Sequence, residues 1–158
     1  MAHRGDGPAL AELWLDTAAG LHRVDPSRFQ IPDADGLADW MDEDLETMGE
    51  TWISFVAVED GRLVGHVQVR LVPPMESARY QVMTDVGTTR GEVTSLGVLS
   101  SHRRRGIGRA LMARAEEWLR GRGAAVVRSD TFIKSPESAP FYDAVGYSVT
   151  AFIFERKL

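Results

Sequence analysis

The chain has 158 residues, 18 basic and 23 acidic side chains, and a formal net charge of −5 at pH 7. Its length suits one domain with a sizeable core, its 44% hydrophobic content excludes a disordered or collagen-like chain, and the lack of cysteine excludes disulfides, thiolate metal sites and a cysteine nucleophile. No apolar run approaches the ~20 residues that span a bilayer, and the N-terminus lacks the apolar core of a signal peptide, so we expect a cytoplasmic protein that enters no membrane.

Two helices are expected in the first fifty residues. Asp6 and Pro8 are typical of a helix start, and a second helix is expected from about Asp35. The second helix has one apolar stripe and an opposite face that is almost wholly acidic, made of Asp39, Asp42, Glu43, Asp44 and Glu46. Residues 1–50 hold 3 basic and 12 acidic side chains. These acids would attract a cationic partner if they bordered a cleft; the alternative is a solvated helix face.

A β-hairpin follows the helices. Residues 52–58 and 63–71 are rich in β-forming side chains, and Asp60-Gly61 between them is a strong hairpin signal. In the second strand the valines alternate with polar residues, so His66 is expected on a solvated face. Residues 73–91 predict a long irregular loop.

The second half of the chain alternates strands with helices. We expect a strand at 92–99, a helix over 106–120, a buried strand at 124–127, a helix over 137–145 and a final extended stretch. This alternation favours a mixed α/β sheet. The acidic composition, without interleaved basic and aromatic residues, argues against bulk nucleic-acid binding.

The sharpest chemical signal is the turn Arg103-Arg104-Arg105-Gly106-Ile107-Gly108, between the strand at 92–99 and its following helix. Small residues let the backbone approach a ligand, the N–H groups of the first helical turn favour an anion, and arginines add positive charge. The turn has no lysine and so is no Walker loop, and Leu111 replaces the third small residue of the dinucleotide fingerprint. The alternative is a tight turn with charged neighbours.

The order of hairpin, strand, Arg-x-x-Gly-x-Gly turn, helix, strand, and a helix bearing Phe141-Tyr142 before Gly146-Tyr147 resembles the GNAT superfamily of acyl-CoA-dependent N-acetyltransferases. The likeness covers about residues 51–158 well and the N-terminal helices only in layout. It implies a single α/β domain over 1–158 with the GNAT-like fold, in which a mostly antiparallel central sheet has flanking helices and strands that splay at the CoA site. Few residues precede Asp6, where the family usually has a first strand, so that strand is expected to be short or missing.

The resemblance implies how acetyl-CoA is held and where the amine acceptor binds. The N-terminal helices, about 7–50, would border the acceptor, and about 92–147 would bind CoA. Many members have an asparagine where this chain has Ser135. The implied CoA-binding residues are Leu96, Gly97, Val98, Arg103, Arg104, Arg105, Gly106, Ile107, Gly108, Arg109 and Ser135.

The resemblance also implies catalytic residues for direct attack of a primary amine on acetyl-CoA in a ternary complex. Tyr142 is the candidate general acid for the leaving thiolate; the alternative is a tyrosine that only packs. Glu92 is the candidate general base; the alternative is a solvent-facing glutamate at a strand entry. Strand alternation is expected to place Glu92 on the same face as Leu96 and Val98.

Two other functional classes remain open from the sequence: a non-catalytic module that binds or senses acyl-CoA, and a protein for a different phosphate ligand. No carboxylate–histidine spacing resembles a zinc site, so no metal is expected. The apolar stretch 151–154 is a possible homodimer contact, with an ordinary core strand as the alternative.

Overall fold

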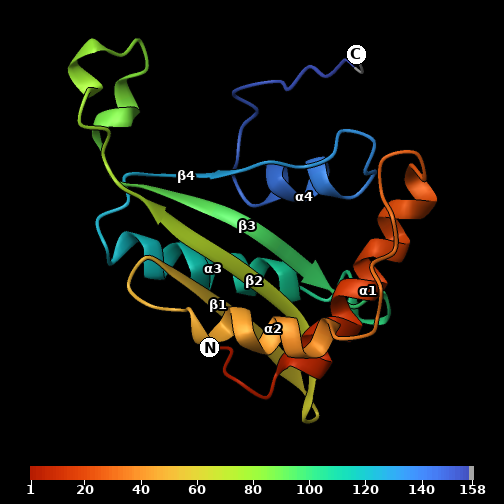
Figure 1. Ribbon diagram of the computed structural model, residues 1–158. Coiled ribbons are helices and arrows are strands. Elements are labelled where there is room, and N and C mark those ends of the chain that lie inside the picture. Colours follow the sequence, from red (N-terminus) through yellow and green to blue (C-terminus); the bar gives the residue numbers. More distant parts are fainter. Residues whose placement is uncertain (157–158) are drawn as a thin grey trace.

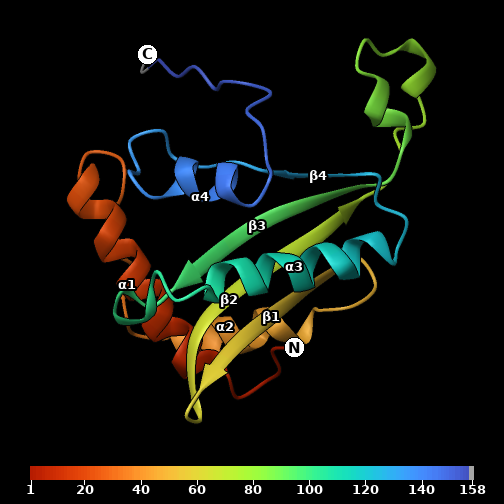
Figure 2. The ribbon, with the colours of Figure 1, turned by 180° about the vertical axis from the view of Figure 1, so that it is seen from behind.

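The computed structural model describes residues 1–156 and has four strands in the order β1-β2-β3-β4. The pairs β1–β2 and β2–β3 are antiparallel and β3–β4 is parallel, which confirms the mixed, mostly antiparallel sheet. Helices α1 and α2 cover one face of the sheet and α3 covers the other (Figures 1 and 2). The elements are α1 (Gly7–Val24), α2 (Leu37–Glu46), β1 (Trp52–Glu59), β2 (Arg62–Val72), β3 (Arg90–Val98), α3 (Ile107–Arg120), β4 (Val126–Ser129) and α4 (Ser138–Ala144), with short 3₁₀ turns η1 (Ala78–Tyr80), η2 (Thr84–Gly87) and η3 (Ser100–His102).

The main hydrophobic core lies between the sheet and α3. Val67 and Val69 of β2 are completely buried there against side chains of α3, among them Met112 and Leu119. The alternation of β2 therefore directs its odd-numbered residues from 65 onward toward α3, as the sequence pattern predicts.

The even-numbered residues of β2 face α1 and α2, not solvent. Val64 packs with Leu10, Leu13 and Leu45 in a second buried cluster. His66 is half-buried on the same face. The expectation of a solvated His66 is wrong because two amphipathic helices cover this face, a contact between distant segments that strand alternation does not reveal.

A β-bulge in β3 changes which side chains share a face. Ser95 pairs with Gln68, whereas Val93 pairs with Val69, so Thr94 is one extra residue. The bulge interrupts alternation, and Val93 and Leu96 both pack in the core on the α3 side. The expected common face for Glu92 and Leu96 is therefore wrong: Glu92 lies on the side of α1 and α2.

The ends of the sheet depart most from expectation. The predicted buried strand at 124–127 is found two residues later as β4, an edge strand whose Val126 is 37% exposed.

Residues 147–156 form no strand, and Phe154 is 93% exposed, so the core-strand alternative for 151–154 is wrong. The predicted extended stretch also includes residues 157–158, which lie outside the described residues. Residues 1–6 form no strand, although the Ala2 N–H donates to the carbonyl of Ser54 at 2.9 Å.

The irregular segment between β2 and β3 contains only η1 and η2. It projects from the end of the sheet where β3 begins, away from α1 (Figure 1). No helix within residues 1–156 is long and apolar enough to cross a membrane.

Candidate functional site

The two parallel strands β3 and β4 separate partway along their length. Their pairing runs from Arg90–Val126 to Val93–Ser129, where β4 ends, while β3 continues to Val98. Leu96, Gly97 and Val98 therefore lie on the part of β3 that has left β4. The predicted splay is confirmed, and one edge of this backbone has no strand partner.

The Arg-x-x-Gly-x-Gly turn begins α3 beside this opening. Gly106 has a left-handed conformation (φ 85°) directly before the first helical residue, Ile107. This conformation favours glycine and leaves the N–H groups of the first helical turn without helical partners, as an anion site requires. Arg104 also has a positive φ of 63° and makes no ion pair within residues 1–156. Arg105 instead pairs with Glu59 at the end of β1, at 2.8 Å.

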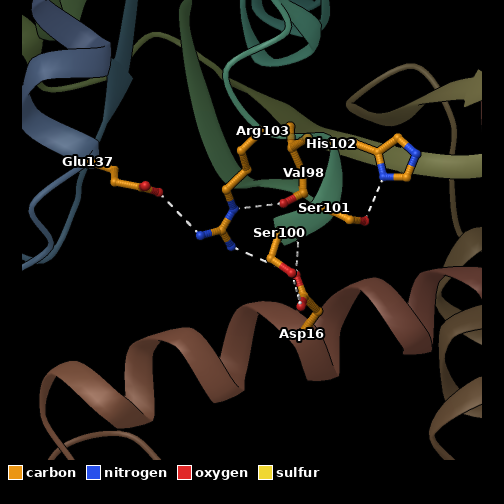
Figure 3. Close-up of polar contacts among 7 residues, drawn as sticks. All are labelled: Asp16, Val98, Ser100, Ser101, His102, Arg103 and Glu137. Carbon is orange, nitrogen blue, oxygen red and sulfur yellow. Dashed lines mark hydrogen bonds and ion pairs between the residues drawn. The ribbon is translucent and has the colours of Figure 1, made fainter.

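Arg103 joins three elements across the opening (Figure 3). Its Nε donates to the carbonyl of Val98 at 3.1 Å, and its Nη1 donates to Glu137, just before α4, at 3.2 Å. Its Nη2 lies 3.8 Å from Asp16 of α1. Asp16 also accepts hydrogen bonds from the N–H and hydroxyl of Ser100. Sequence reasoning missed Asp16 and Glu137, because nothing in the local pattern links them to the turn.

We expect the Arg103→Ala variant to bind acetyl-CoA about tenfold more weakly, because the end of β3 and the start of α4 would lose their common partner. Calorimetric titration measures this loss. Arg62→Ala is the matched control, since Arg62 pairs with Glu12 away from the turn. Equal affinities of the two variants would mean that Arg103 contributes only exposed ion pairs of little value.

Helix α4 packs directly on the turn. A Cβ placed on Gly108 would lie 3.2 Å from the ring of Phe141, so glycine allows this close approach. Arg109 donates to the carbonyl of Ala144 at 2.8 Å, at the other end of α4. Ser135 lies in the preceding loop, where its hydroxyl is 2.7 Å from that of Ser138. The structure thus brings Gly108 and Arg109 together with α4, while the hydroxyl of Ser135 contacts the first residue of α4 and neither Gly108 nor Arg109.

Tyr142 lies where the strands begin to part. The hydroxyl of Ser129, the last residue of β4, donates to the Tyr142 oxygen at 2.6 Å. The phenolic proton is therefore not used in that bond and remains available to a ligand. Burial raises the pKa of Tyr142 above its ordinary value, with Asp130 adding to the rise and the Ser129 hydrogen bond opposing it. Tyr142 is thus a protonated donor at neutral pH.

Glu92 lies at the same level of the sheet on the opposite face. Its carboxylate accepts from Arg70 Nε at 2.7 Å, and Glu92 pairs in register with Arg70. Six residues separate it from Val98, roughly 20 Å along an extended strand. The structure therefore does not bring Glu92 to the backbone of 96–98, and Glu92 and Tyr142 flank the sheet from its two sides.

Some of the acidic side chains on α2 form hydrogen bonds or ion pairs with other parts of the protein. Asp42 accepts from the N–H groups of Gly5 and Gly7, both at 2.8 Å. Asp44 accepts from Gln68 at 3.1 Å, and Glu46 pairs with Arg4. Three of the five acids therefore have partners in the protein, so neither a simple solvated face nor a free carboxylate cluster describes them.

A small cavity of about 20 Å³ lies between α1 and the sheet, beside β3. Its lining includes His66, which the sequence pattern placed in solvent, so this residue was missed as a site residue.

Within residues 1–156 no three histidine, aspartate or glutamate side chains are grouped so as to hold a metal ion. The free N–H groups at the start of α3 and the neighbouring arginines suit the anionic end of a ligand.

The model of the Acetyltransferase (GNAT) family matches residues 14–147. No curated protein matches the sequence. Among solved structures, the chain is similar to a transcriptional regulator from Bacillus halodurans C-125 (19% identity, 99% of this chain and 96% of that one, TM-score 0.75). It is also similar to the aminoglycoside N-acetyltransferase AAC(6')-Iy in complex with CoA (20%, 99% and 91%, TM-score 0.68). A putative acetyltransferase from Agrobacterium tumefaciens gives 22% identity, 99% and 96% coverage and a TM-score of 0.69. At these identities the structures support the fold.

Proposed function

The chain belongs to the GNAT acetyltransferase family, and from this premise we propose that it transfers the acetyl group of acetyl-CoA to a primary amine by direct attack in a ternary complex. The observation that carries the proposal is the separation of β3 from β4 after Val93, beside the turn that begins α3. A solved relative with this fold holds CoA, which supports acyl-CoA as the donor.

We propose that the donor occupies this opening. The backbone of 96–98 would bond the acetyl and pantetheine portions, the N–H groups and arginines of 103–109 would hold the phosphates, and Ser135 would lie beside the donor. The helices within 7–50 would border the acceptor, and the chain would act as one catalytic domain.

The proposed transfer uses one proton donor and one proton acceptor. The amine nitrogen attacks the thioester carbon, so a C–N bond forms while the C–S bond breaks. Tyr142 gives its phenolic proton to the leaving thiolate. Because Glu92 is not adjacent to the backbone of 96–98, the amine proton would reach it along a chain of several water molecules. The placement of these two residues on opposite faces suits an amine that arrives from the side of α1 and a thiol that leaves toward α4.

Calorimetric titration with acetyl-CoA, with NAD and ATP as controls, tests the donor. We expect saturable binding of acetyl-CoA alone, followed by CoA release in a panel of primary amines. Binding of a nucleotide instead would indicate another phosphate ligand. Binding without CoA release across the panel would favour a non-catalytic module that binds or senses acyl-CoA.

We also propose that the exposed apolar segment 151–154 is a homodimer contact. Phe152 and Phe154 are both exposed, and large exposed apolar patches mark protein contacts. Sedimentation measurements should show a dimer that the double variant Phe152→Ser, Phe154→Ser converts to a monomer. A monomeric parent protein would refute this contact.

A further inference from the structure

Three polar side chains gather around Gly97 in the cavity beside β3. His66 faces Gly97 in the register of β2 and β3. Thr17 Oγ1 would lie 3.2 Å from a Cβ placed on Gly97, and Ser95 lines the same cavity. The rest of the lining is Leu10, Leu13, Trp14 and Met41 from the two N-terminal helices, together with Leu96 of β3.

These polar groups have no partner in the part of the chain that the structure describes. Within residues 1–156 the side chains of His66, Ser95 and Thr17 make no hydrogen bond or ion pair, although all three are half-buried. The cavity of about 20 Å³ has room for a group of about the size of one water molecule, and such a group could bond all three side chains at once. The three side chains therefore form a small polar site that one hydrogen-bonding group of a ligand can fill.

The cavity is also uncharged. Among residues 1–156, no carboxylate or cationic side chain lines it. The nearby acids Asp42 and Asp44 of α2 are bonded elsewhere, and burial lowers the pKa of His66 to about 4, so its imidazole is neutral at pH 7. A site of this kind offers hydrogen bonds but no charge to offset the desolvation of an ammonium group.

We propose that this cavity receives the nucleophilic end of the acceptor, and that the acceptor is a weakly basic amine, uncharged at neutral pH, on an apolar body, such as an arylamine. His66, Ser95 and Thr17 bond the amino group. A cavity of about 20 Å³ admits little more than this group. The apolar body lies at the cavity mouth against Trp14, which is 37% exposed.

This inference rests on the proposed acetyl transfer and narrows its substrate class. It disfavours polyamines and lysine side chains, which carry a full positive charge at neutral pH. The net charge of the first fifty residues by itself favours the opposite choice. The uncharged lining of the cavity favours the uncharged amine, and the acids of α2 that are bonded to other groups of the protein do not oppose this choice.

Aniline and benzylamine form the test pair, because both carry a phenyl ring and only benzylamine is an ammonium ion at pH 7. The chain has four histidines, so imidazole NMR signals of the CoA-bound protein can be resolved, and His66→Gln identifies the signal of His66. We expect aniline to shift that signal saturably at concentrations where benzylamine does not. No shift with aniline, or an equal shift with benzylamine, overturns the proposal.

Variants provide the second readout. In the His66→Leu variant we expect KM for aniline to rise about tenfold or more while acetyl-CoA affinity stays unchanged, because one hydrogen bond to the acceptor is lost. His3→Gln is the matched control, since His3 is exposed near the N-terminus. If His66→Leu does not fold, the double variant Thr17→Val, Ser95→Ala takes its place. An unchanged KM for aniline in the folded variant contradicts the assignment.

The experiments distinguish a failure of the proposed acetyl transfer from a failure of the proposed acceptor class. A protein that binds no acetyl-CoA refutes the proposed function. A protein that binds acetyl-CoA and acetylates benzylamine at least as well as aniline at pH 7 refutes only the acceptor class.

Discussion

We expect the Tyr142→Phe variant to lower kcat about 100-fold, because a positioned general acid contributes at least this much to proton transfer. The phenylalanine keeps the ring contacts with Phe141 and Tyr147, whose centroids lie 5.4 and 5.5 Å away, so the fold should be preserved. Only the hydroxyl is removed, together with the bond from Ser129. Steady-state kinetics at saturating acetyl-CoA and amine measure the effect, and calorimetry should give an unchanged affinity for acetyl-CoA.

Tyr80→Phe is the matched control, since Tyr80 is 73% exposed in the projecting segment between β2 and β3. A Tyr142→Phe variant as active as Tyr80→Phe would mean that Tyr142 only packs. The thiolate would then take its proton from water or another group.

We expect His66 alone to reduce the free energy of unfolding by about 3 kcal/mol as the pH falls from 6.5 to 4. Burial lowers the pKa of this imidazole from 6.5 to about 4 in the folded protein. In this window the unfolded chain binds a proton that the folded protein does not, so acid favours unfolding. The contribution is complete above pH 6.5 and is lost as the pH approaches 4.

Urea unfolding at a series of pH values measures this dependence. The His66→Gln variant should show a shallower loss of stability between pH 6.5 and 4, because glutamine does not titrate. His3→Gln should follow the parent protein. Parallel curves for the parent and His66→Gln would show that the imidazole remains hydrated in the folded state.

Local patterns predicted the elements that we propose hold the donor. The alternation of β2, the Asp60-Gly61 turn and the glycines before α3 fix local geometry through backbone sterics and side-chain period, which depend on near neighbours in the chain. These were sufficient to place the turn 103–108 between a strand and a helix. The proposed catalytic roles of Glu92 and Tyr142 came from family resemblance, and no contact in the structure by itself assigns the chemistry to either residue.

The sequence by itself determined the order of strands and helices, the glycine turn at the start of α3 and the family. Only the tertiary structure decided which faces are covered, where β3 leaves β4, and which acids are free. The bulge at Thr94 turned Glu92 to the face opposite Leu96, and the packing of α1 and α2 on β2 made His66 half-buried and neutral. These outcomes depend on contacts between segments far apart in the chain, and burial by distant segments sets both side-chain direction and charge state.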